Sequence, residues 1–368
     1  MTTTYFYFPP EPLQAAVRDV FQASGSPPEE AALIARRLVK ANLTGHDSHG
    51  TIRVHPYLER LRKGMIRPGQ RLTPLRQVGP TAVFSANRGY GQVGATLAME
   101  VAIAKARTAN IAAVGLTDVN HIGRLADYAV MAAEADMIGI VLTSSGGASR
   151  IVAPYGSNEG RLSTNPMSVA FPSDRASPVV LDMATSAWAN GKFKVMIDNK
   201  WQAPEGLLYD KQGRPSTDPS DLYEGGAIRP LGAEQGYKGT LLAVWVEILA
   251  GLLTGGGTVG SIDPGGVTNN TTLLFALNVA AFRALPVFKA ELERLIDYLK
   301  ATRPAPGREV LWPGELEART EAQRRAEGIP LAADTVAGLQ EELTRYGVPT
   351  RVESLATRSA AGATPSLG

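Results

Sequence analysis

Three of the four histidines of the chain, His46, His49 and His55, fall within ten residues in the stretch TGHDSHGTIRVHPY. Imidazole exchanges protons near neutral pH and also binds metal ions, so this stretch predicts either acid–base catalysis or a metal site. The metal site is disfavoured because Gly45 and Gly50 interrupt a helix there, and no downstream acid lies at a recognisable ligand spacing. A metal-dependent hydrolase or lyase that uses the three histidines is therefore the remote alternative.

Asp47, Ser48 and His49 are adjacent in the sequence and raise the possibility of a Ser-His-Asp hydrolase. Three neighbours cannot align as a relay because alternate side chains diverge, and no G-x-S-x-G motif is present. General acid–base catalysis by His49 fits better, with Ser48 orienting the ring. Arg53 follows one helical turn later and could bind a substrate carboxylate, and Tyr57 lies four residues further on. The four residues in register favour a catalytic site over a helix cap with surface polar residues.

The fourth histidine, His121, lies in DVNHIGRLADYA, where an apolar strand gives way to a helix. A residue at such a junction is well placed to face a ligand. The alternative is a helix-capping Asn120 with an incidental histidine, and the residues alone leave both open. Lys192, in ANGKFK, lacks the upstream glycine of a phosphate-binding loop and is not a nucleotide-triphosphate lysine. The small-residue loop SSGGASR (144–150) is a possible phosphate cradle.

The stretch GYGQVG, residues 89–94, matches the dinucleotide-binding fingerprint G-x-G-x-x-G. A predicted strand at 81–85 precedes it, a predicted helix at 92–108 follows, and Asp118 lies about where the ribose-binding acid belongs. However, the first glycine of that fingerprint belongs at the strand end, whereas three residues, 86–88, intervene here. We therefore expect these glycines to shape a turn and to allow close packing of helix on sheet.

The elements that would carry these residues are predicted from apolar periodicity. Residues 10–64 read as helical. From 71 to 182 the pattern predicts strands at 81–85, 111–117, 137–143, 167–172 and 178–182 and helices at 92–108 and 123–135. Residues 201–222 read as turns, 238–253 as a helix, 254–270 as a flexible Gly-rich loop, TLLFALNV as a strand, VFKAELERLIDYLKAT as a helix, and 356–368 as a disordered tail. Such alternation indicates an α/β or α+β protein.

Composition excludes several classes of protein. The chain has 368 residues, 44% hydrophobic and 20% charged, which suits a globular protein of two or three lobes. The net charge of +2, without a basic block, gives nucleic-acid binding no electrostatic support. Cysteine is absent, so disulfides, thiolate metal sites and cysteine nucleophiles are excluded. The start does not read as a signal peptide and the apolar stretch 240–253 is too short to span a bilayer, so we expect a cytoplasmic enzyme.

Several ordered stretches between about residues 10 and 345 resemble the malate/L-lactate dehydrogenase family, which is unrelated to the Rossmann-type lactate and malate enzymes. They are ANLTGHDSHGTIRVHPYLERLRKGMI, DVNHIGRLADYAVMAAEADMIGI, APYGSNEGRLSTNPMSVAFP, VVLDMATSAWANGK, GYKGTLLAVWVEILAGLLTGG and EVLWPGELEART. GHDSHG, NHIGR and LDMATSA look closest to the hydroxycarboxylate dehydrogenase B subgroup. The family also holds ureidoglycolate, sulfolactate and diketogulonate oxidoreductases and imino-acid reductases.

The resemblance implies an architecture. A helical lobe of residues 1–75, completed by segments from about 280–355, would pack on a non-Rossmann cofactor lobe of residues 76–255 with a mostly antiparallel mixed sheet. Two chains would form an intertwined homodimer.

The resemblance also implies residue roles. Ser48 and His49 match the relay serine and proton donor, and His121 matches a histidine with acid–base duty in the ureidoglycolate branch. Arg53 and Tyr57 match residues that line the substrate and nicotinamide region. Cofactor-contacting positions are matched by Ser145, Thr164, Asn165, Asp182, Met183, Ala184, Gly314 and Glu315. Two departures are notable. Many members read His-Lys-Gly-Tyr-Gly where this chain has residues 234–238. Gln235, which precedes Gly236, therefore stands at the position of a lysine that faces the cofactor in those members. Either Gln235 replaces that lysine, or Lys238 supplies the amino group instead. Imino-acid reductases carry an acid at the position of Lys192.

The expected activity is hydride transfer between a nicotinamide cofactor and a 2-hydroxy acid/2-oxo acid pair such as lactate, malate or aryl-lactate, without a metal. His49 is the favoured acid–base group, His121 the other candidate, and Arg53 the carboxylate-binding cation. The alternative is an NAD(P)H-dependent reductase of cyclic imino acids, which Lys192 disfavours. NAD is slightly favoured over NADP on the expectation that Glu315 reaches the adenosine ribose. Partners other than a small acid and a second copy of the chain are not expected.

Overall fold

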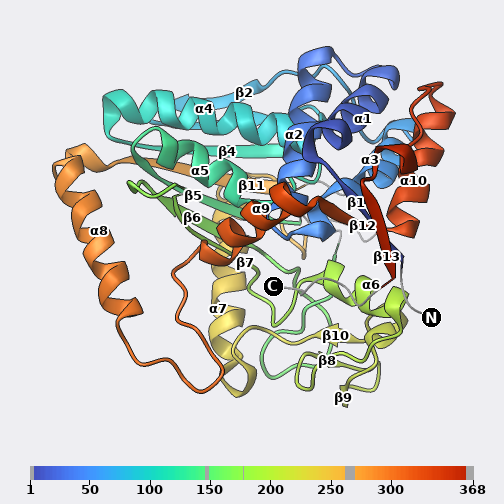
Figure 1. The fold of residues 1–368 in the computed structure, drawn as a ribbon. Coiled ribbons are helices and arrows are strands. Elements are labelled where there is room, and N and C mark those ends of the chain that lie inside the picture. Colours follow the sequence, from blue (N-terminus) through green and yellow to red (C-terminus); the bar gives the residue numbers. More distant parts are fainter. Residues whose placement is uncertain (1–3, 146–148, 177, 262–269, 362–368) are drawn as a thin grey trace.

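The computed structural model describes residues 4–145, 149–176, 178–261 and 270–361. Its centre is a seven-stranded sheet in the order β2-β3-β4-β11-β5-β6-β7 (Figure 1). The strands are β2 (Thr73–Val78), β3 (Thr81–Ser85), β4 (Ile111–Val119), β11 (Asn270–Asn278), β5 (Met137–Ser144), β6 (Met167–Phe171) and β7 (Val179–Met183). Only the β3–β4 pair is parallel. The prediction of a mostly antiparallel mixed sheet in an α/β protein is therefore confirmed.

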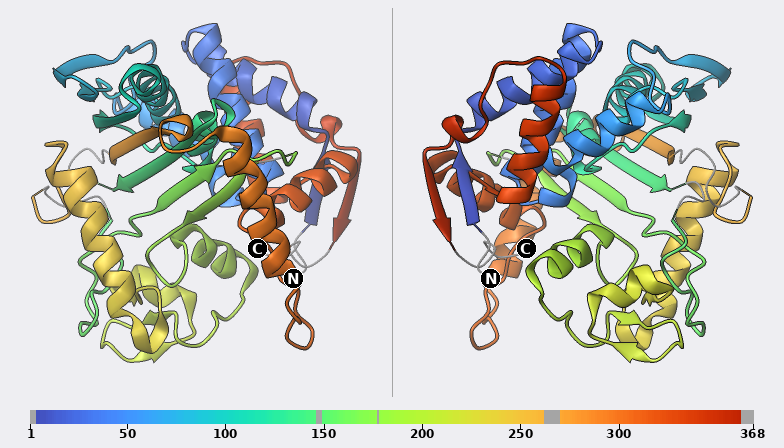
Figure 2. Two further views of the ribbon diagram at one scale, coloured as in Figure 1. Left: turned by 90° about the vertical axis from the view of Figure 1, so that its left-hand side faces the viewer. Right: turned by 90° about the vertical axis from the view of Figure 1, so that its right-hand side faces the viewer.

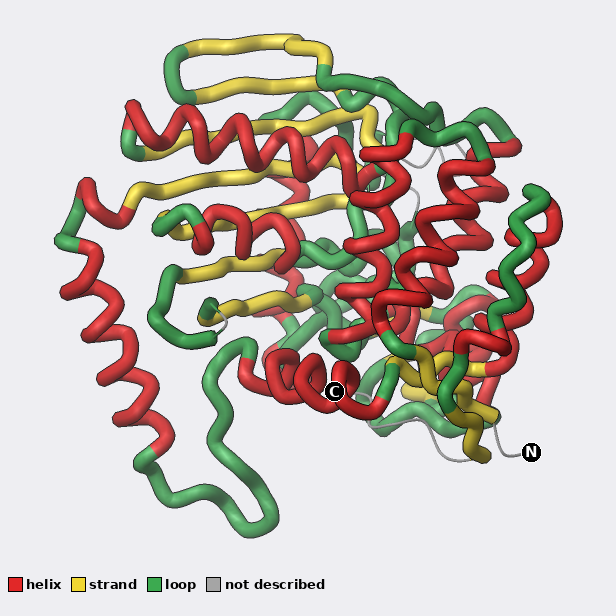
Figure 3. The backbone as a smooth tube through the Cα atoms, turned by 45° about the horizontal axis from the view of Figure 1, so that its top comes forward, coloured by secondary structure: helices red, strands yellow, loops and turns green. Residues whose placement is uncertain are grey.

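Helices cover both faces of this sheet. On one face lie α4 (Gly91–Ala109) and α5 (Ala126–Glu134) (Figure 3). Their alanine-rich sides pack closely on β4, β11, β5 and β6. On the other face α7 (Tyr237–Val246) continues as a π-helical segment η5 (Glu247–Leu252), and Val246 and Ala250 pack on Leu142 of β5. Figure 2 shows α7, in yellow, on the side of the sheet away from α4. The predicted strands and helices of this region are confirmed to within three residues at each end.

A second core joins the two ends of the chain. It combines α1 (Pro10–Ala23), α2 (Pro28–Leu43), the short helices η1 (Asp47–His49) and η2 (Thr51–Arg53), and α3 (Val54–Arg62) with α10 (Ala333–Arg345). A small antiparallel sheet β12-β1-β13 closes it, formed by β12 (Ile329–Ala332), β1 (Thr4–Phe8) and β13 (Arg358–Ala361). The prediction of a disordered tail from 356 is wrong for residues 358–361, because their backbone pairs with β1. The rest of that tail, 362–368, lies outside the described residues.

The C-terminal segments do not all join this core. Helix α8 (Leu285–Lys300) lies far from α1, α2, α3 and α10 in Figure 1, and its Ile296 packs with Val179 of β7 and with Trp312. The C-terminal part of the helical core begins at Ile329 rather than near 280, because α8 packs its buried face on β7, the outermost strand of the sheet. Between them lies α9 (Glu315–Glu327). We propose the division into a helical lobe and a sheet lobe on these two cores.

The segment between β7 and α7 forms a third, smaller core of irregular structure. It contains α6 (Asn190–Asn199), the short strands β8 (Leu208–Tyr209), β9 (Pro215–Ser216) and β10 (Ala227–Ile228), and the short helices η3 (Pro219–Glu224) and η4 (Ala233–Gln235). Two further short helices are η6 (Val279–Ala281) and η7 (Glu353–Leu355). Most of the predicted loop 254–270 lies outside the described residues. Among the described residues, no helix combines the length and the apolar character that crossing a membrane requires.

Candidate active site

The polar residues singled out in the sheet region gather at one edge of the sheet. Antiparallel pairing sets the end of one strand beside the start of the next. The register pairs Asn270 with Val119, Thr271 with Ser144, and Met167 with both Leu142 and Met183. The residues that follow β4 and β5, precede β6, or end and follow β7 therefore meet at this edge: Asn120, His121, Ser145, Thr164, Asn165, Asp182, Met183 and Ala184. The strand order thus collects residues that are up to 64 positions apart in the sequence.

The loop that carries Ser48 and His49 is anchored from behind by α9. Arg324, itself buried, donates to Asp47 Oδ1 and Oδ2 at 2.7 and 3.0 Å and also to the Asn42 carbonyl. The Asn42 side chain donates to Asp47 Oδ1 at 2.6 Å and accepts from the Thr51 amide at 2.8 Å. A Cβ at Gly50 would lie 2.3 Å from Asn42 Oδ1, so only glycine fits there. These contacts hold the turn that presents His49.

Ser48 and Arg53 flank His49 as the spacing predicted. Ser48 Oγ lies 3.0 Å from His49 Nδ1, and Arg53 Nε donates to the Ser48 carbonyl at 2.6 Å. Arg53 makes no ion pair with any residue that the structure describes, so its two terminal nitrogens are available to an anion. The start of α6 packs on the same turn, because a Cβ at Gly191 would lie 2.5 Å from Ser48 Cβ. Lys192 is thereby brought near His46, whose pKa its charge helps to lower.

The second histidine meets the first across the lobes. The His49 and His121 rings stack with their centroids 5.4 Å apart and an interplanar angle of 22°. Tyr57 Oη lies 2.6 Å from His121 Nδ1, and Gln92 Nε2 donates to the same phenol oxygen at 2.9 Å. The structure thus brings the predicted residues Ser48, His49, Tyr57 and His121 together.

Burial and nearby cations keep both rings neutral. Burial is the main cause that lowers the pKa of His49 to about 3, and Arg53 and Arg124 lower it further. The pKa of His121 lies well below its ordinary value for the same reasons, burial first and then Arg53. Burial also raises the pKa of Tyr57, which stays a phenol. A neutral imidazole can accept a proton, which is what oxidation of an alcohol requires.

The site is positively charged. Besides Arg53, the ammonium group of Lys192 lies 4.8 Å from the centre of the Trp188 ring, and burial lowers the pKa of Lys192. Arg124 is buried and pairs with Asp127 at 2.9 Å. Arg124 is thus balanced by Asp127, and it is Arg53 and Lys192 that would favour binding of a small anionic substrate.

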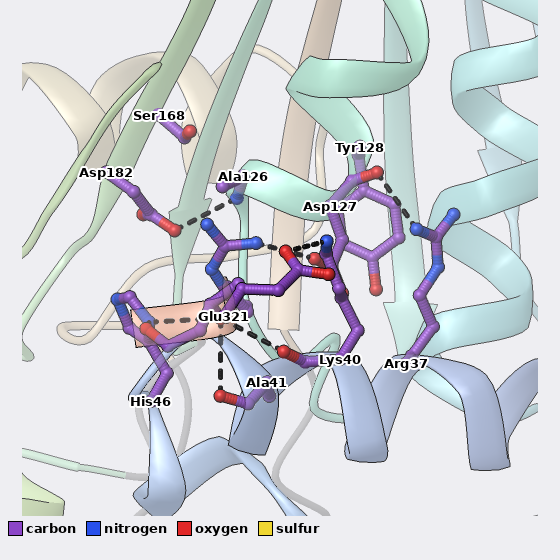
Figure 4. Close-up of polar contacts among 12 residues, drawn as sticks. Arg37, Lys40, Ala41, His46, Ala126, Asp127, Tyr128, Ser168, Asp182 and Glu321 are labelled. Atoms are coloured by element: carbon purple, nitrogen blue, oxygen red, sulfur yellow. Dashed lines mark hydrogen bonds and ion pairs between the residues drawn. The ribbon is translucent and has the colours of Figure 1, made fainter. Parts of the chain in front are cut away.

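Asp182 holds the start of α5. Its Oδ2 accepts the Ala126 amide at 3.0 Å, and Figure 4 shows this contact with Asp127 and Tyr128 on the same helix. A carboxylate at a helix N-terminus is stabilised by the helix dipole. Burial nevertheless outweighs Arg124 and the Ala126 amide and raises the pKa of Asp182 to about 6.

Other predicted cofactor positions mostly support the site from behind. Ser163 Oγ donates to Ser145 Oγ at 2.6 Å, and the Thr164 carbonyl accepts from the backbone of Thr185 at 2.9 Å. Asn165 is fully buried and donates to the Ala243 carbonyl and to Glu247, both at 2.9 Å. Gln235 and Gly236 lie at the turn between η4 and α7.

Glu315 does not present a free carboxylate. Both of its oxygens accept from Lys300, at 2.6 and 2.8 Å, and Arg319 and the Trp312 amide add further bonds. Gly314 precedes it with a φ of 93°, a conformation that favours glycine. The expectation that Glu315 binds a ribose hydroxyl, and the preference for NAD that rested on it, therefore lose their support.

The three histidines of the metal alternative do not meet. His55 points to α10 and pairs with Glu342 at 2.8 Å, and Glu342 also receives two hydrogen bonds from Arg62. In the described parts of the chain, the one group with metal-ligand geometry is His55, Glu341 and Glu342, without His46 or His49. The remote alternative of a three-histidine hydrolase is wrong, because α3 carries His55 to the opposite side of the helix from Tyr57.

Two residues that contact the site, Arg324 and Gln92, were not predicted from the sequence. Arg324 lies in a segment without a motif, and no signal short of the fold could have found it. Gln92 lies inside GYGQVG, a stretch in which only the glycines belong to the fingerprint. The expectation for these glycines holds in part. A Cβ at Gly91 would lie 2.2 Å from the His121 carbonyl oxygen, so Gly91 permits close packing, but the positive φ angles of the turn belong to Asn87 and Arg88.

Comparison with known proteins gives concordant results. The family model for malate/L-lactate dehydrogenase matches residues 8–340. L-sulfolactate dehydrogenase of Methanocaldococcus jannaschii is 34% identical over 92% of this chain and 97% of its own, and hydroxycarboxylate dehydrogenase B of Escherichia coli is 34% identical over 93% and 95%. A crystal structure of malate dehydrogenase from Entamoeba histolytica superposes with a TM-score of 0.89 at 30% identity, over 94% of this chain and 99% of that one.

Proposed function

The chain belongs to the malate/L-lactate dehydrogenase family, and we propose that His49 is the acid–base group with which it interconverts a 2-hydroxy acid and the corresponding 2-oxo acid. The observation that carries this proposal is the stacked His49–His121 pair beside Arg53, whose terminal nitrogens are available. One group to move a proton and one cation to hold a carboxylate are what such a substrate needs.

The chain's own residues supply the proton chemistry. Arg53 binds the substrate carboxylate through its terminal nitrogens, while its Nε stays on the Ser48 carbonyl. Neutral His49 takes the hydroxyl proton on Nε2 as the C2 hydrogen leaves as hydride, and Ser48 holds Nδ1. In the reverse direction protonated His49 returns that proton to the oxo oxygen. Lys192 adds positive charge near the substrate.

A nicotinamide cofactor fits the same sheet edge. A bound nicotinamide ring supplies the two-electron hydride acceptor or donor. Buried Asn165 Oδ1 and Trp188 Nε1, at or beside this edge, have no hydrogen-bond partner within the described chain, as expected where a polar ligand completes the set. We propose that Ser145, Thr164, Asp182, Met183 and Ala184 hold the cofactor, with Gln235, Gly236 and Gly314 nearby. Asn165 would contribute its unpaired oxygen.

A substrate panel tests the proposal. Lactate-type, malate-type, aryl-lactate-type and sulfonated 2-oxo acids and two cyclic imino acids are offered with NADH and with NADPH, and loss of the reduced-nicotinamide absorbance is followed in the presence of a chelator. We expect turnover of 2-oxo acids, and the ratio of kcat/KM for the two cofactors assigns NAD or NADP. Turnover of cyclic imines alone would establish the imino-acid alternative. Activity in the His49→Asn variant within twofold of the parent enzyme would refute the assignment of His49.

We further propose that the chain is a homodimer. Five residues on one stripe of α7 and η5 are large, apolar and exposed, by 42–63% of their surface: Tyr237, Leu241, Trp245, Ile248 and Leu252. An exposed apolar stripe of this length indicates a protein interface. Light scattering is expected to give twice the chain mass, and the double variant Leu241→Asp, Ile248→Asp is expected to give a monomer. A monomeric parent enzyme would refute this proposal.

A further inference from the structure

Gln92 is the polar residue of GYGQVG that the proposed function does not use. It lies near the start of α4, is 1% exposed, and reaches from the sheet lobe to Tyr57 on α3. Its side chain therefore connects the lobe that carries His121 with the lobe that carries Tyr57.

The surroundings of Gln92 hold it in place. Gly91 packs directly on the Asn120 and His121 carbonyls, where a Cβ would lie 2.3 and 2.2 Å from the two oxygens. The Asn120 side chain donates to the carbonyls of Met65, Arg88 and Gly89, at 2.9–3.2 Å, and accepts from Arg60 at 3.0 Å. The turn that carries His121 is thus held by Gly91 at the start of α4, by the loop before α4, and by Arg60 and Met65 at the end of α3 and just after it.

The direction of the hydrogen bonds follows from the donor at Gln92. An amide nitrogen can only donate, so the Tyr57 oxygen accepts this bond and directs its own single proton elsewhere. The other partner of that oxygen is His121 Nδ1, at 2.6 Å. Nδ1 therefore accepts, and a neutral His121 ring must carry its proton on Nε2.

We propose that Gln92 is a positioning residue that holds His121 as the Nε2–H tautomer, so that His121 donates a hydrogen bond to the substrate oxygen and cannot act as the base. This inference rests on the proposed function. The proton balance is then complete: the hydroxyl proton passes to His49 Nε2, the hydride leaves C2, and His121 keeps its own proton throughout. A donor aimed at the oxygen stabilises the charge that develops there during transfer.

The tautomer can be read without substrate, so it is independent of any activity. Long-range proton–nitrogen correlation spectra of enzyme labelled with 15N-histidine distinguish a protonated ring nitrogen from a bare one, and the chain has only four histidines. The His121→Gln variant identifies the signals of His121. We expect Nε2 to be protonated and Nδ1 to be bare. Protonation on Nδ1 in the parent enzyme would overturn the inference, even if the enzyme turns over 2-oxo acids.

Two variants test the role of Gln92 itself. In Gln92→Glu a carboxylate can accept the Tyr57 proton, so Tyr57 would accept from His121 Nδ1–H and the tautomer should switch. We expect kcat to fall by about a hundredfold, the usual loss when an oriented donor is removed from a reacting oxygen. The matched control is Gln22→Glu, at an exposed position on α1, which should change neither spectrum nor kcat. An unchanged His121 tautomer in Gln92→Glu would overturn the role of Gln92. Failure of every 2-oxo acid with a confirmed tautomer would instead refute the proposed function.

Discussion

Acidification from pH 7.5 to 5.5 is expected to destabilise the protein, because it protonates the histidines of the unfolded chain but not the buried rings of the folded one. Burial is the main cause that lowers the pKa of both His46 and His49 from 6.5 to about 3. The unfolded chain therefore binds more protons than the folded one between these values. The stability that these groups contribute is complete above pH 6.5 and is lost as the pH falls toward 3. His121, with its pKa also lowered, acts in the same direction.

The size of the effect follows from the shifts. Between pH 7.5 and 5.5 each of the two histidines lowers the free energy of unfolding by ~1.4 kcal/mol. Asp182 opposes them, because its pKa is raised from 3.8 to about 6 and the folded state takes up a proton in this range. That contribution is ~0.8 kcal/mol, which leaves a net loss of about 2 kcal/mol before the addition of His121. Burial also raises the pKa of Glu30, so Glu30, like Asp182, opposes the loss of stability on acidification.

Urea unfolding of the ligand-free enzyme at the two pH values, at one protein concentration, measures this loss. The matched variant is His46→Asn, which removes one titrating ring and can still donate a hydrogen bond to the Thr44 carbonyl, 3.1 Å from His46 Nδ1. The variant should lose ~1.4 kcal/mol less than the parent enzyme between the two pH values. Equal stability of the parent enzyme at both pH values, or an equal loss in the variant, would refute the idea that these rings are buried in the neutral form.

Further outcomes are expected at three other positions. Arg53→Gln should raise KM for the 2-oxo acid by about tenfold to a hundredfold, since it removes a charged hydrogen bond of ~1.5–3 kcal/mol, and leave KM for the cofactor unchanged in steady-state assays. Arg324→Met should lower the free energy of unfolding by about 1–3 kcal/mol and also reduce kcat, because it removes the hydrogen bonds of Arg324 to the Asp47 carboxylate and to the Asn42 carbonyl; an unchanged kcat would contradict its role behind the His49 turn. Gly91→Ala places a Cβ 2.2 Å from a backbone oxygen and should cost about 1–3 kcal/mol, whereas the control Gly338→Ala, with its nearest neighbour 4.0 Å away in a helix, should be neutral or slightly stabilising in thermal unfolding.

The regular elements were largely predictable because their signals are local. Apolar alternation predicted β3 at the residues where the structure has it, and helical apolar spacing predicted α4, α5 and α8 to within a few residues. Local patterning failed at β13, since Arg358–Ala361 become a strand only where β1 offers its unpaired backbone. It failed again at α8, whose apolar stripe does not say which surface it will cover.

The proposed catalytic residues divide in the same way. The sequence by itself predicted that Ser48, His49, Arg53 and Tyr57 lie near one another, because they fall within ten residues of the chain. It also indicated the type of chemistry, since those side chains move protons and bind carboxylates.

Only the tertiary structure decided how the two histidines differ and which charges are already engaged. The stacking of His49 on His121 and the bond from Gln92 to Tyr57 join segments far apart in the chain. Glu315 looked available in the sequence but is held by Lys300 and Arg319. Hydrogen-bond direction, burial and pKa depend on which groups approach within a few ångströms, and that proximity is set by the packing of the two cores rather than by any local pattern.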